Sequence, residues 1–433
     1  MDSPALPYEL LFLVIENIDS SSVEGHRTLS AISLSNRSLR FACQDRMFKD
    51  VKISYLGPSF AQDMERGIDF WDGELTTGWK FRDLLFESPH IRPYVERLTI
   101  TILPSLNRPQ GHIASSTSAT FSLYDIGHLL PNLKKFLTFQ TGPFGWYSVS
   151  ERMRAFFVTI ASSVNELDLR PFRLVPADIL SECHNLRILH VSSVDIGEGT
   201  SAGNLVTKTK LRGLRIGFSS LDNEPTTTWI STPQSPLDIS ELLSITCYNS
   251  LTLTRGLNTL LAHCFGALKE LSFYVDLYGE DIADETEPVV DLSGLLNLQC
   301  LTIRSNIRAR DRLGEMETIA ANFLSIATVL KSLPFGKLQR QQLQFNLVLA
   351  VIYLEDFDSK LATLPPWSYV VDVLADNRSS SRISEANVKI RRIQRQNGPV
   401  HVNMTTAALT SILDKNEQLK DLRERGLLSY HVF

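Results

Sequence analysis

The chain has 433 residues, of which 43% are hydrophobic and 21% are charged. This composition is typical of a globular protein, and it excludes wholesale disorder and collagen-like repetition. The formal net charge of −5 is nearly balanced for this length, which argues against a globally basic nucleic-acid-binding protein. The five cysteines show neither CxxC nor zinc-site spacing, so we expect no disulfide scaffold.

No stretch approaches the roughly 18 apolar residues that a membrane-spanning helix needs. The first residues carry no basic segment and no small-residue cleavage site, so the chain does not begin like a secreted protein. We therefore expect a protein of the cytoplasm, the nucleus or both, with free cysteines and without membrane contact.

Three short helices are predicted in the first 55 residues, at Leu6–Ile18, His26–Leu34 and Leu39–Phe48. The first of these is apolar on more than one side, because every residue of Leu10–Ile15 is hydrophobic. Two short neighbouring helices can cover only one of its faces. The remaining face is covered either by a partner or by the rest of the chain, and the pattern leaves both alternatives open.

From about residue 90 onward, the element apolar-x-x-apolar-x-apolar recurs. Its six clear copies begin at Val95, Val164, Leu186, Leu211, Leu268 and Leu298. Helical stretches are predicted before several copies, at Glu151–Ser163, Ala177–Cys183, Leu257–Cys264 and Glu317–Leu333. One strand and one helix per unit is the pattern of an irregular leucine-rich repeat, in which the second and third apolar positions point into the core. The alternative is an ordinary α/β sheet.

Two segments rich in proline, serine and threonine, 104–120 and 219–237, are predicted to be loop insertions. The segment Asp276–Asp291 carries seven acids and no base, and the segment Arg378–Arg395 carries six bases and one acid. Each is interpreted as a solvated stretch, with a docking surface for a basic partner as the alternative for the acidic one.

Motifs for covalent chemistry are absent from the sequence. The glycines of Gly197–Gly203 resemble a dinucleotide loop, but the next strand begins too soon for a crossover helix. No GxSxG, HExxH, Walker A or EF-hand pattern occurs. No aromatic residue is interleaved with Arg391, Arg392 and Arg395. We expect neither an enzyme nor a cofactor, a metal or a nucleic acid.

The outward-facing positions of the repeated strands are the best candidates for contact with a protein. Their mixture of charged, histidine and tyrosine side chains suits a polar and specific protein surface. The predicted substrate-binding residues are Asp168, Arg170, His190, Ser192, Arg215, Tyr274, Thr302 and Arg304.

A known motif is matched near the start of the chain. Leu6-Pro7-x-Glu9-Leu10 and Ile15-x-x-Ile18 are followed by the run Leu29–Arg37 and by Phe48-Lys49-Asp50-Val51. Together they resemble the F-box of fungal, basidiomycete-type F-box proteins with irregular leucine-rich repeats, although Leu39 stands where an aromatic residue is usual. Weaker likenesses continue through the chain, at Phe81–Ile100, Trp367–Leu374 and Leu419–Leu428.

The resemblance implies an α/β fold in four parts. A three-helix F-box occupies residues 1–55 and a connecting segment 56–92. A leucine-rich-repeat-like solenoid occupies residues 93–350, and the last irregular repeats with a C-terminal cap occupy 351–433.

The resemblance also implies a function, that of the substrate-recognition subunit of an SCF-type cullin–RING ubiquitin ligase. The F-box binds a Skp-type adaptor, the solenoid binds an unknown protein substrate, and the contribution to the reaction is proximity. The implied adaptor-binding residues are Leu6, Pro7, Leu10, Leu11 and Ile15. The alternative is a leucine-rich-repeat interaction scaffold without a role in ubiquitin ligation.

Overall fold

The structure is a computed structural model, in which the chain forms two compact units, Met1–Ser201 and Ala202–Phe433. The described residues are 7–20, 22–56, 76–103, 126–140, 144–148, 151–170, 172–195, 208–217, 223–248, 253–275, 290–308, 315–338, 343–352, 367–376, 383–393 and 406–432. These residues build a mixed α/β fold with parallel strand pairs, which confirms the α/β character that the sequence predicts. No described helix has the length and apolar character needed to cross a membrane.

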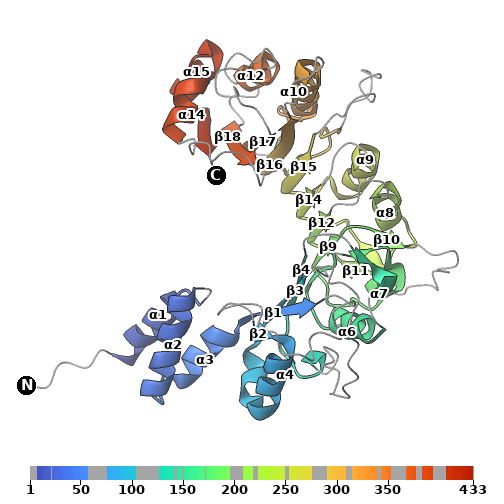
Figure 1. Cartoon of the computed structure of the whole chain (residues 1–433). Helices are drawn as coiled ribbons and strands as arrows, with labels where there is room; N and C mark the ends of the chain where they lie inside the picture. The colour runs from blue at the N-terminus through green and yellow to red at the C-terminus, as the bar shows by residue number, and fades with distance from the viewer. Residues whose placement is uncertain are drawn as a thin grey trace, which may run out of the picture. The chain divides into compact units, whose positions relative to one another are not determined.

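The first unit begins with three helices (Figure 1): α1 (Tyr8–Asn17), α2 (Val23–Ser35) and α3 (Arg40–Phe48). All three were predicted within a few residues. Pro7 precedes α1, and its carbonyl oxygen accepts the first backbone hydrogen bonds of the helix. The Ser22 side chain accepts a hydrogen bond from the backbone N–H of Gly25 and so caps α2.

A parallel sheet follows in the first unit, with strand order β2-β1-β3-β4-β6-β9. Its strands are β1 (Asp50–Leu56), β2 (Thr76–Thr77), β3 (Arg97–Leu103), β4 (Lys135–Gln140), β6 (Glu166–Asp168) and β9 (Ile188–Val191). The helices between them are α4 (Gly78–Glu87), the 3-10 helices η3 (Pro89–Tyr94) and η4 (Trp146–Ser148), α6 (Glu151–Ala161) and α7 (Ala177–Ser181). Two short strand pairs stand apart from this sheet: β5 (Phe144–Gly145) with β7 (Phe172–Arg173), and β8 (Val175–Pro176) with β10 (Val194–Asp195).

The second unit contains a second run of parallel strands, whose order in the sheet is their order in the chain. They are β12 (Gly213–Ile216), β14 (Ser244–Cys247), β15 (Glu270–Tyr274), β16 (Cys300–Arg308), β17 (Leu343–Ile352), β18 (Ile383–Ile393) and β19 (Leu428–Val432). The short strands β11 (Thr209–Lys210) and β13 (Leu237–Asp238) pair separately.

The helices of the second unit follow one another along one side of its sheet (Figure 1). They are α8 (Asn223–Ile230), α9 (Leu253–Cys264), α10 (Glu315–Ser332), α12 (Trp367–Ala375), α14 (Thr406–Leu413) and α15 (Glu417–Glu424). Aromatic side chains join neighbouring helices, as where the rings of Phe323 and Trp367 lie 4.9 Å apart.

The core of both units lies between strands and helices, at the positions that the repeated pattern predicts. The second and third apolar residues of the clear copies are buried, among them Leu98 and Ile100 in the first unit and Leu301 and Ile303 in the second. In the first unit, the Phe136 ring of β4 packs edge-on against two phenylalanine rings of α6, at 5.6 and 5.4 Å. The prediction of which strand positions face the core is therefore confirmed.

One predicted loop is wrong. The segment 219–237 contains helix α8 and the start of β13. Pro225 falls in the first turn of α8, where its missing N–H leaves no helical hydrogen bond unmade, and Trp229 and Ile230 at the other end of the helix are buried. The predicted loop 104–120 lies outside the described residues, as does most of the acidic segment.

Candidate interaction surfaces

An unusually apolar surface lies on the first helix. Tyr8, Leu10, Phe12, Leu13 and Val14 of α1 have exposed fractions between 41% and 53%, whereas Ile15 is only 3% exposed. A single stripe of the helix therefore faces the protein. The opposite sides carry large hydrophobic side chains into solvent, which is typical of a surface that binds another protein.

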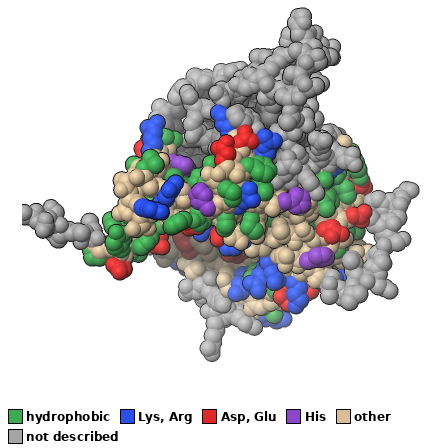
Figure 2. Space-filling model, turned by 90° about the horizontal axis from the view of Figure 1, so that it is seen from below, with side chains coloured by type: hydrophobic (Ala, Val, Ile, Leu, Met, Phe, Trp, Pro, Cys, Tyr) green, Lys and Arg blue, Asp and Glu red, His purple; other side chains and the backbone are tan. Residues whose placement is uncertain are grey.

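The core beneath α1 is small. It consists of Ile15, Leu29, Leu39 and Cys43, with Leu11 and Ile18 partly buried against it. Leu34 near the end of α2 and Phe41 in α3 add further exposed apolar area, at 86% and 63%. Hydrophobic side chains are visible over these helices at the left of Figure 2. A cluster of this size has room for only a fraction of the apolar side chains in the three helices.

The structure gives the implied adaptor-binding residues different degrees of exposure. Pro7 and Leu10 are exposed, and Leu11 is half-buried. Ile15 is a core residue, so its side chain is not accessible on the surface of α1, and its contact with an adaptor stays a prediction. Leu6 lies outside the described residues. Sequence reasoning did not single out the exposed Tyr8, Phe12, Leu13 and Val14, because an unbroken apolar run does not reveal which side of a helix faces the core.

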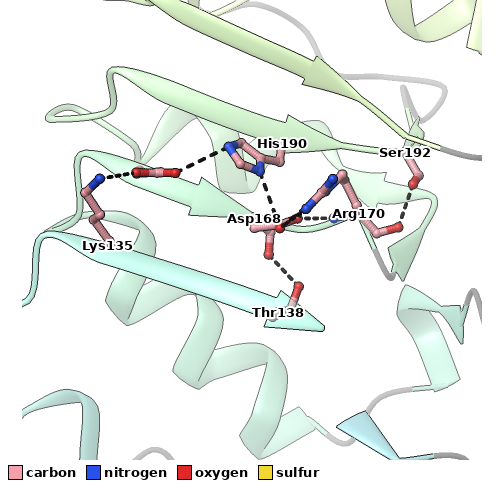
Figure 3. Close-up of polar contacts among 7 residues, drawn as sticks. Lys135, Thr138, Asp168, Arg170, His190 and Ser192 are labelled. Atoms are coloured by element: carbon pink, nitrogen blue, oxygen red, sulfur yellow. Dashed lines mark hydrogen bonds and ion pairs between the residues drawn. The ribbon is translucent and has the colours of Figure 1, made fainter. Parts of the chain in front are cut away.

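In the first unit, an ionic network crosses β4, β6 and β9 (Figure 3). Lys135 Nζ lies 2.8 Å from Glu166 Oε2, and the His190 ring lies between Glu166 and Asp168, at 3.5 and 3.3 Å. Arg170 Nη2 lies 2.7 Å from Asp168 Oδ2. His190 and Asp168 are 1% and 2% exposed, and among the described residues no hydrogen bond of good geometry reaches either ring nitrogen of His190.

The pKa of Asp168 is lowered by its surroundings. Burial, the largest influence, would raise the pKa of this carboxyl group, but interactions with His190 and Arg170 outweigh it and hold the pKa below its ordinary value. The backbone N–H of Arg170 also donates to Asp168 Oδ1 at 3.0 Å, and Thr138 Oγ1 donates to the Asp168 carbonyl oxygen at 2.6 Å. The carboxylate is therefore kept charged, and the network ties three strands together.

This burial contradicts the expectation that Asp168, His190 and Ser192 face a binding partner. Ser192 is 1% exposed, and its hydroxyl donates to the Arg170 carbonyl oxygen. Arg170 remains partly accessible, with 28% of its side chain exposed. Strand alternation predicts the side of the sheet correctly, but it says nothing of what else covers that side. Glu166 and Lys135 belong to the same network, and their outward strand positions are the sequence signal that points to them.

The predicted residues of the second unit remain accessible. Arg215 is exposed, and Tyr274, Thr302 and Arg304 are half-buried. The strand register aligns Thr302 with Asn346 of β17 and Tyr274 with Arg304. These side chains therefore share the side of the sheet that faces away from its helices.

A ladder of hydrogen bonds fixes the polar groups at one end of this face. Asn387 Nδ2 donates to Asn346 Oδ1 at 3.1 Å, and Asn346 Nδ2 lies 3.5 Å from Thr302 Oγ1. The Ser429 hydroxyl donates to Asn387 Oδ1 and lies 3.0 Å from His431 Nε2. The ladder connects β16, β17, β18 and β19 and makes this end of the face rigid.

The described residues include no cluster of histidine, cysteine, aspartate and glutamate placed to hold a metal ion. The two most distinctive surfaces described are an apolar one on α1–α3 and a polar one on the sheet of the second unit.

No known family model matches the sequence, and no curated protein matches it.

Proposed function

We propose that the protein is the substrate-recognition subunit of an SCF-type cullin–RING ubiquitin ligase. In this proposal, α1–α3 form an F-box that binds a Skp-type adaptor. The strands that follow form an irregular leucine-rich-repeat solenoid that binds a substrate protein. The observation that carries the proposal is the apolar surface on the first three helices.

That surface is concentrated in a short part of the chain. Of the fourteen exposed large hydrophobic residues in the described part, seven lie in α1–α3. Burial of apolar area is worth about 25 cal/mol per Å², so a partner that covers these side chains gains a substantial driving force. Their position agrees with the adaptor-binding helix that the sequence motif implies.

The order of the strands supports the second half of the proposal. From β12 to β19, each strand of the second unit pairs in parallel with its predecessor and successor among the strands of this sheet. In the described residues, an α-helix lies in five of the six connections between them. Stacking of one strand-containing unit on the next is how solenoid proteins build an extended binding face.

The mechanism is positional. The helices attach the chain to the ligase, the sheet face holds the substrate, and the substrate lysine is thereby kept near the ubiquitin-carrying enzyme. No side chain of this protein needs to form or break a bond in this scheme.

Co-expression of the full chain with a fungal Skp-type adaptor tests the proposal. We expect a 1:1 complex on size-exclusion chromatography. The double variant Leu10→Asp with Leu13→Asp places two charges on the exposed surface without touching the core, and we expect the bound adaptor to fall about tenfold or more. The matched control is Leu243→Asp with Leu324→Asp, which alters two exposed leucines of the second unit.

Two separate peaks for the unmodified chain and the adaptor overturn the proposal and favour an interaction scaffold without a ligase role. Equal loss of adaptor from both double variants also overturns it, because the surface on α1 would then have no special part in binding.

A further inference from the structure

We infer that the outward face of the second unit's sheet binds an extended acidic segment of a partner protein through a row of cationic and aromatic side chains. The inference rests on the proposed function, because it names the chemistry of the substrate that this face holds. The row consists of Tyr248, Tyr274, Arg304, Lys389 and His431, and is called the cationic row below.

The strand register aligns the cationic row across the sheet. Tyr274 pairs with Arg304, and Arg304 pairs with Val348 of β17. Val348 pairs with Lys389, and Lys389 pairs with His431. Tyr248 directly follows β14, where it continues the register toward Tyr274. All these side chains point away from the helices, because their strand neighbours such as Phe273 and Ile303 are buried in the core.

Arg304 is held in place by aromatic rings. Its guanidinium carbon lies 5.6 Å from the centre of the Tyr248 ring and 5.7 Å from that of Tyr274. The arginine side chain therefore extends from β16 back across two strands and rests on both rings. A guanidinium held in this way loses little freedom when a carboxylate binds to its N–H groups.

The charges on this face favour an acidic ligand. Within the described part of the chain, Arg304 and Lys389 form no ion pair, and the cationic row contains no acid. The neighbouring row, Arg215, Thr246, Ser272, Thr302, Asn346, Asn387 and Ser429, contains none either. Among the described strand residues of this face, the acids are Glu270 and Glu385, which lie four residues before Tyr274 on β15 and four before Lys389 on β18.

The dimensions suit an extended peptide. The cationic row crosses six strands, from β14 to β19, and strands about 4.8 Å apart give it a length of about 24 Å. An extended segment of about seven residues covers this length at 3.3 Å per residue. The rigid ladder of Asn346, Asn387 and Ser429 lies beside it and limits the entropy lost when the partner binds.

Fluorescence anisotropy with the full chain tests the inference. The probe is a labelled peptide of about eight residues that alternates glutamate and serine, and the comparison peptide carries glutamine instead. We expect the glutamate peptide to bind about tenfold tighter, and we expect added salt to weaken its binding. The variant Arg304→Glu with Lys389→Glu should lower its affinity about tenfold or more.

The matched control is Arg212→Glu with Lys269→Glu. It makes the same charge change at two exposed residues that precede β12 and β15. Its affinity for the glutamate peptide should stay within about twofold of that of the unmodified chain. The single variant Arg304→Gln removes the positive charge with little change in the shape of the side chain. It therefore tests the inference even if the double variant does not fold. Circular dichroism of each variant checks its fold.

Equal affinity for both peptides, or equal loss in both double variants, overturns the inference. So does a phosphoserine peptide that binds more than about tenfold tighter than the glutamate peptide, since the ligand would then be a phosphate. A chain that co-purifies with the adaptor but does not bind the glutamate peptide overturns this inference alone. A chain that binds the peptide but not the adaptor overturns the proposed function alone.

Discussion

Gly256 of α9 and Thr227 of α8 lie in direct contact, so that a Cβ atom at Gly256 would clash with Thr227 Oγ1. Thr227 is completely buried. The two helices can approach this closely only because residue 256 has no side chain. This contact sets the packing of neighbouring helices behind β12 and β14.

The substitution Gly256→Ala should therefore lower the free energy of unfolding by about 1–3 kcal/mol, because one helix must move to accommodate the methyl group. Urea denaturation followed by circular dichroism measures the change. Gly266→Ala is the control, since a Cβ atom there has no neighbour within 4 Å. A Gly256→Ala protein as stable as the control would contradict the described contact.

The ionic network of the first unit predicts a pH-dependent contribution to stability. The substitution Asp168→Asn should cost about 3 kcal/mol at neutral pH, because Arg170 and His190 lose their charged partner. The pKa of Asp168 is lower in the folded chain than the value of about 3.9 expected when unfolded. Its stabilisation is therefore complete above about pH 4 and is lost as the pH falls through the folded pKa.

Urea denaturation of both proteins between about pH 7 and pH 3 checks this prediction. The difference in the free energy of unfolding between the unmodified chain and Asp168→Asn should narrow only at the acid end of this range. Asp421→Asn is the comparison variant, because Asp421 forms an exposed ion pair with Arg425 and should contribute less than about 0.5 kcal/mol. If this difference stays constant with pH, the contribution of Asp168 to stability does not depend on its charge.

Two neighbouring residues of α1 should respond differently to truncation. Ile15→Ala removes a core side chain and should destabilise the three N-terminal helices by roughly 2–4 kcal/mol. Leu13→Ala removes a side chain that is 53% exposed and should change stability by less than about 0.5 kcal/mol. Hydrogen exchange measured by mass spectrometry over α2 and α3 reports the difference, and equal protection in both variants would contradict the described orientation of α1.

The cysteines should be unreactive in the folded protein. Burial raises the pKa of Cys183, Cys247 and Cys264 to about 12, and it also raises the pKa of Cys43 and Cys300. Because the thiolate is the reactive form, a disulfide reagent at about pH 8 should modify at most the half-buried Cys300 quickly. All five cysteines should react after unfolding, and several fast-reacting thiols in the native chain would refute the prediction.

The sequence pattern predicts the strands better than it predicts the surface. Leu214 and Ile216 are buried as their place in the repeat requires, because the alternation of a strand decides which side chains face the helices. The same alternation put Asp168 and His190 on the outward side, yet both are buried. Their burial depends on tertiary contacts that a period of two residues does not encode.

The first helix shows a different limit. Six consecutive hydrophobic residues predict a helix with unpaired apolar area, and the exposure of Leu10 and Leu13 agrees with that. The run could not show that Ile15 faces inward, since any of its residues could supply the buried stripe. The three prolines around helix α8 are typical of a loop and hide the helix from the sequence pattern, although Pro225 falls within its first turn.

The chain-order arrangement of strands in the second unit bears on how the protein folds. Each strand of the main sheet there pairs with the strands of that sheet that precede and follow it in the chain, so these pairings join segments a few tens of residues apart. Contacts of low sequence separation form quickly, because little loop entropy is lost in closing them. A lengthened connection between two strands should then disturb one pair of neighbours, which allows the connecting loops to diverge while the sheet persists.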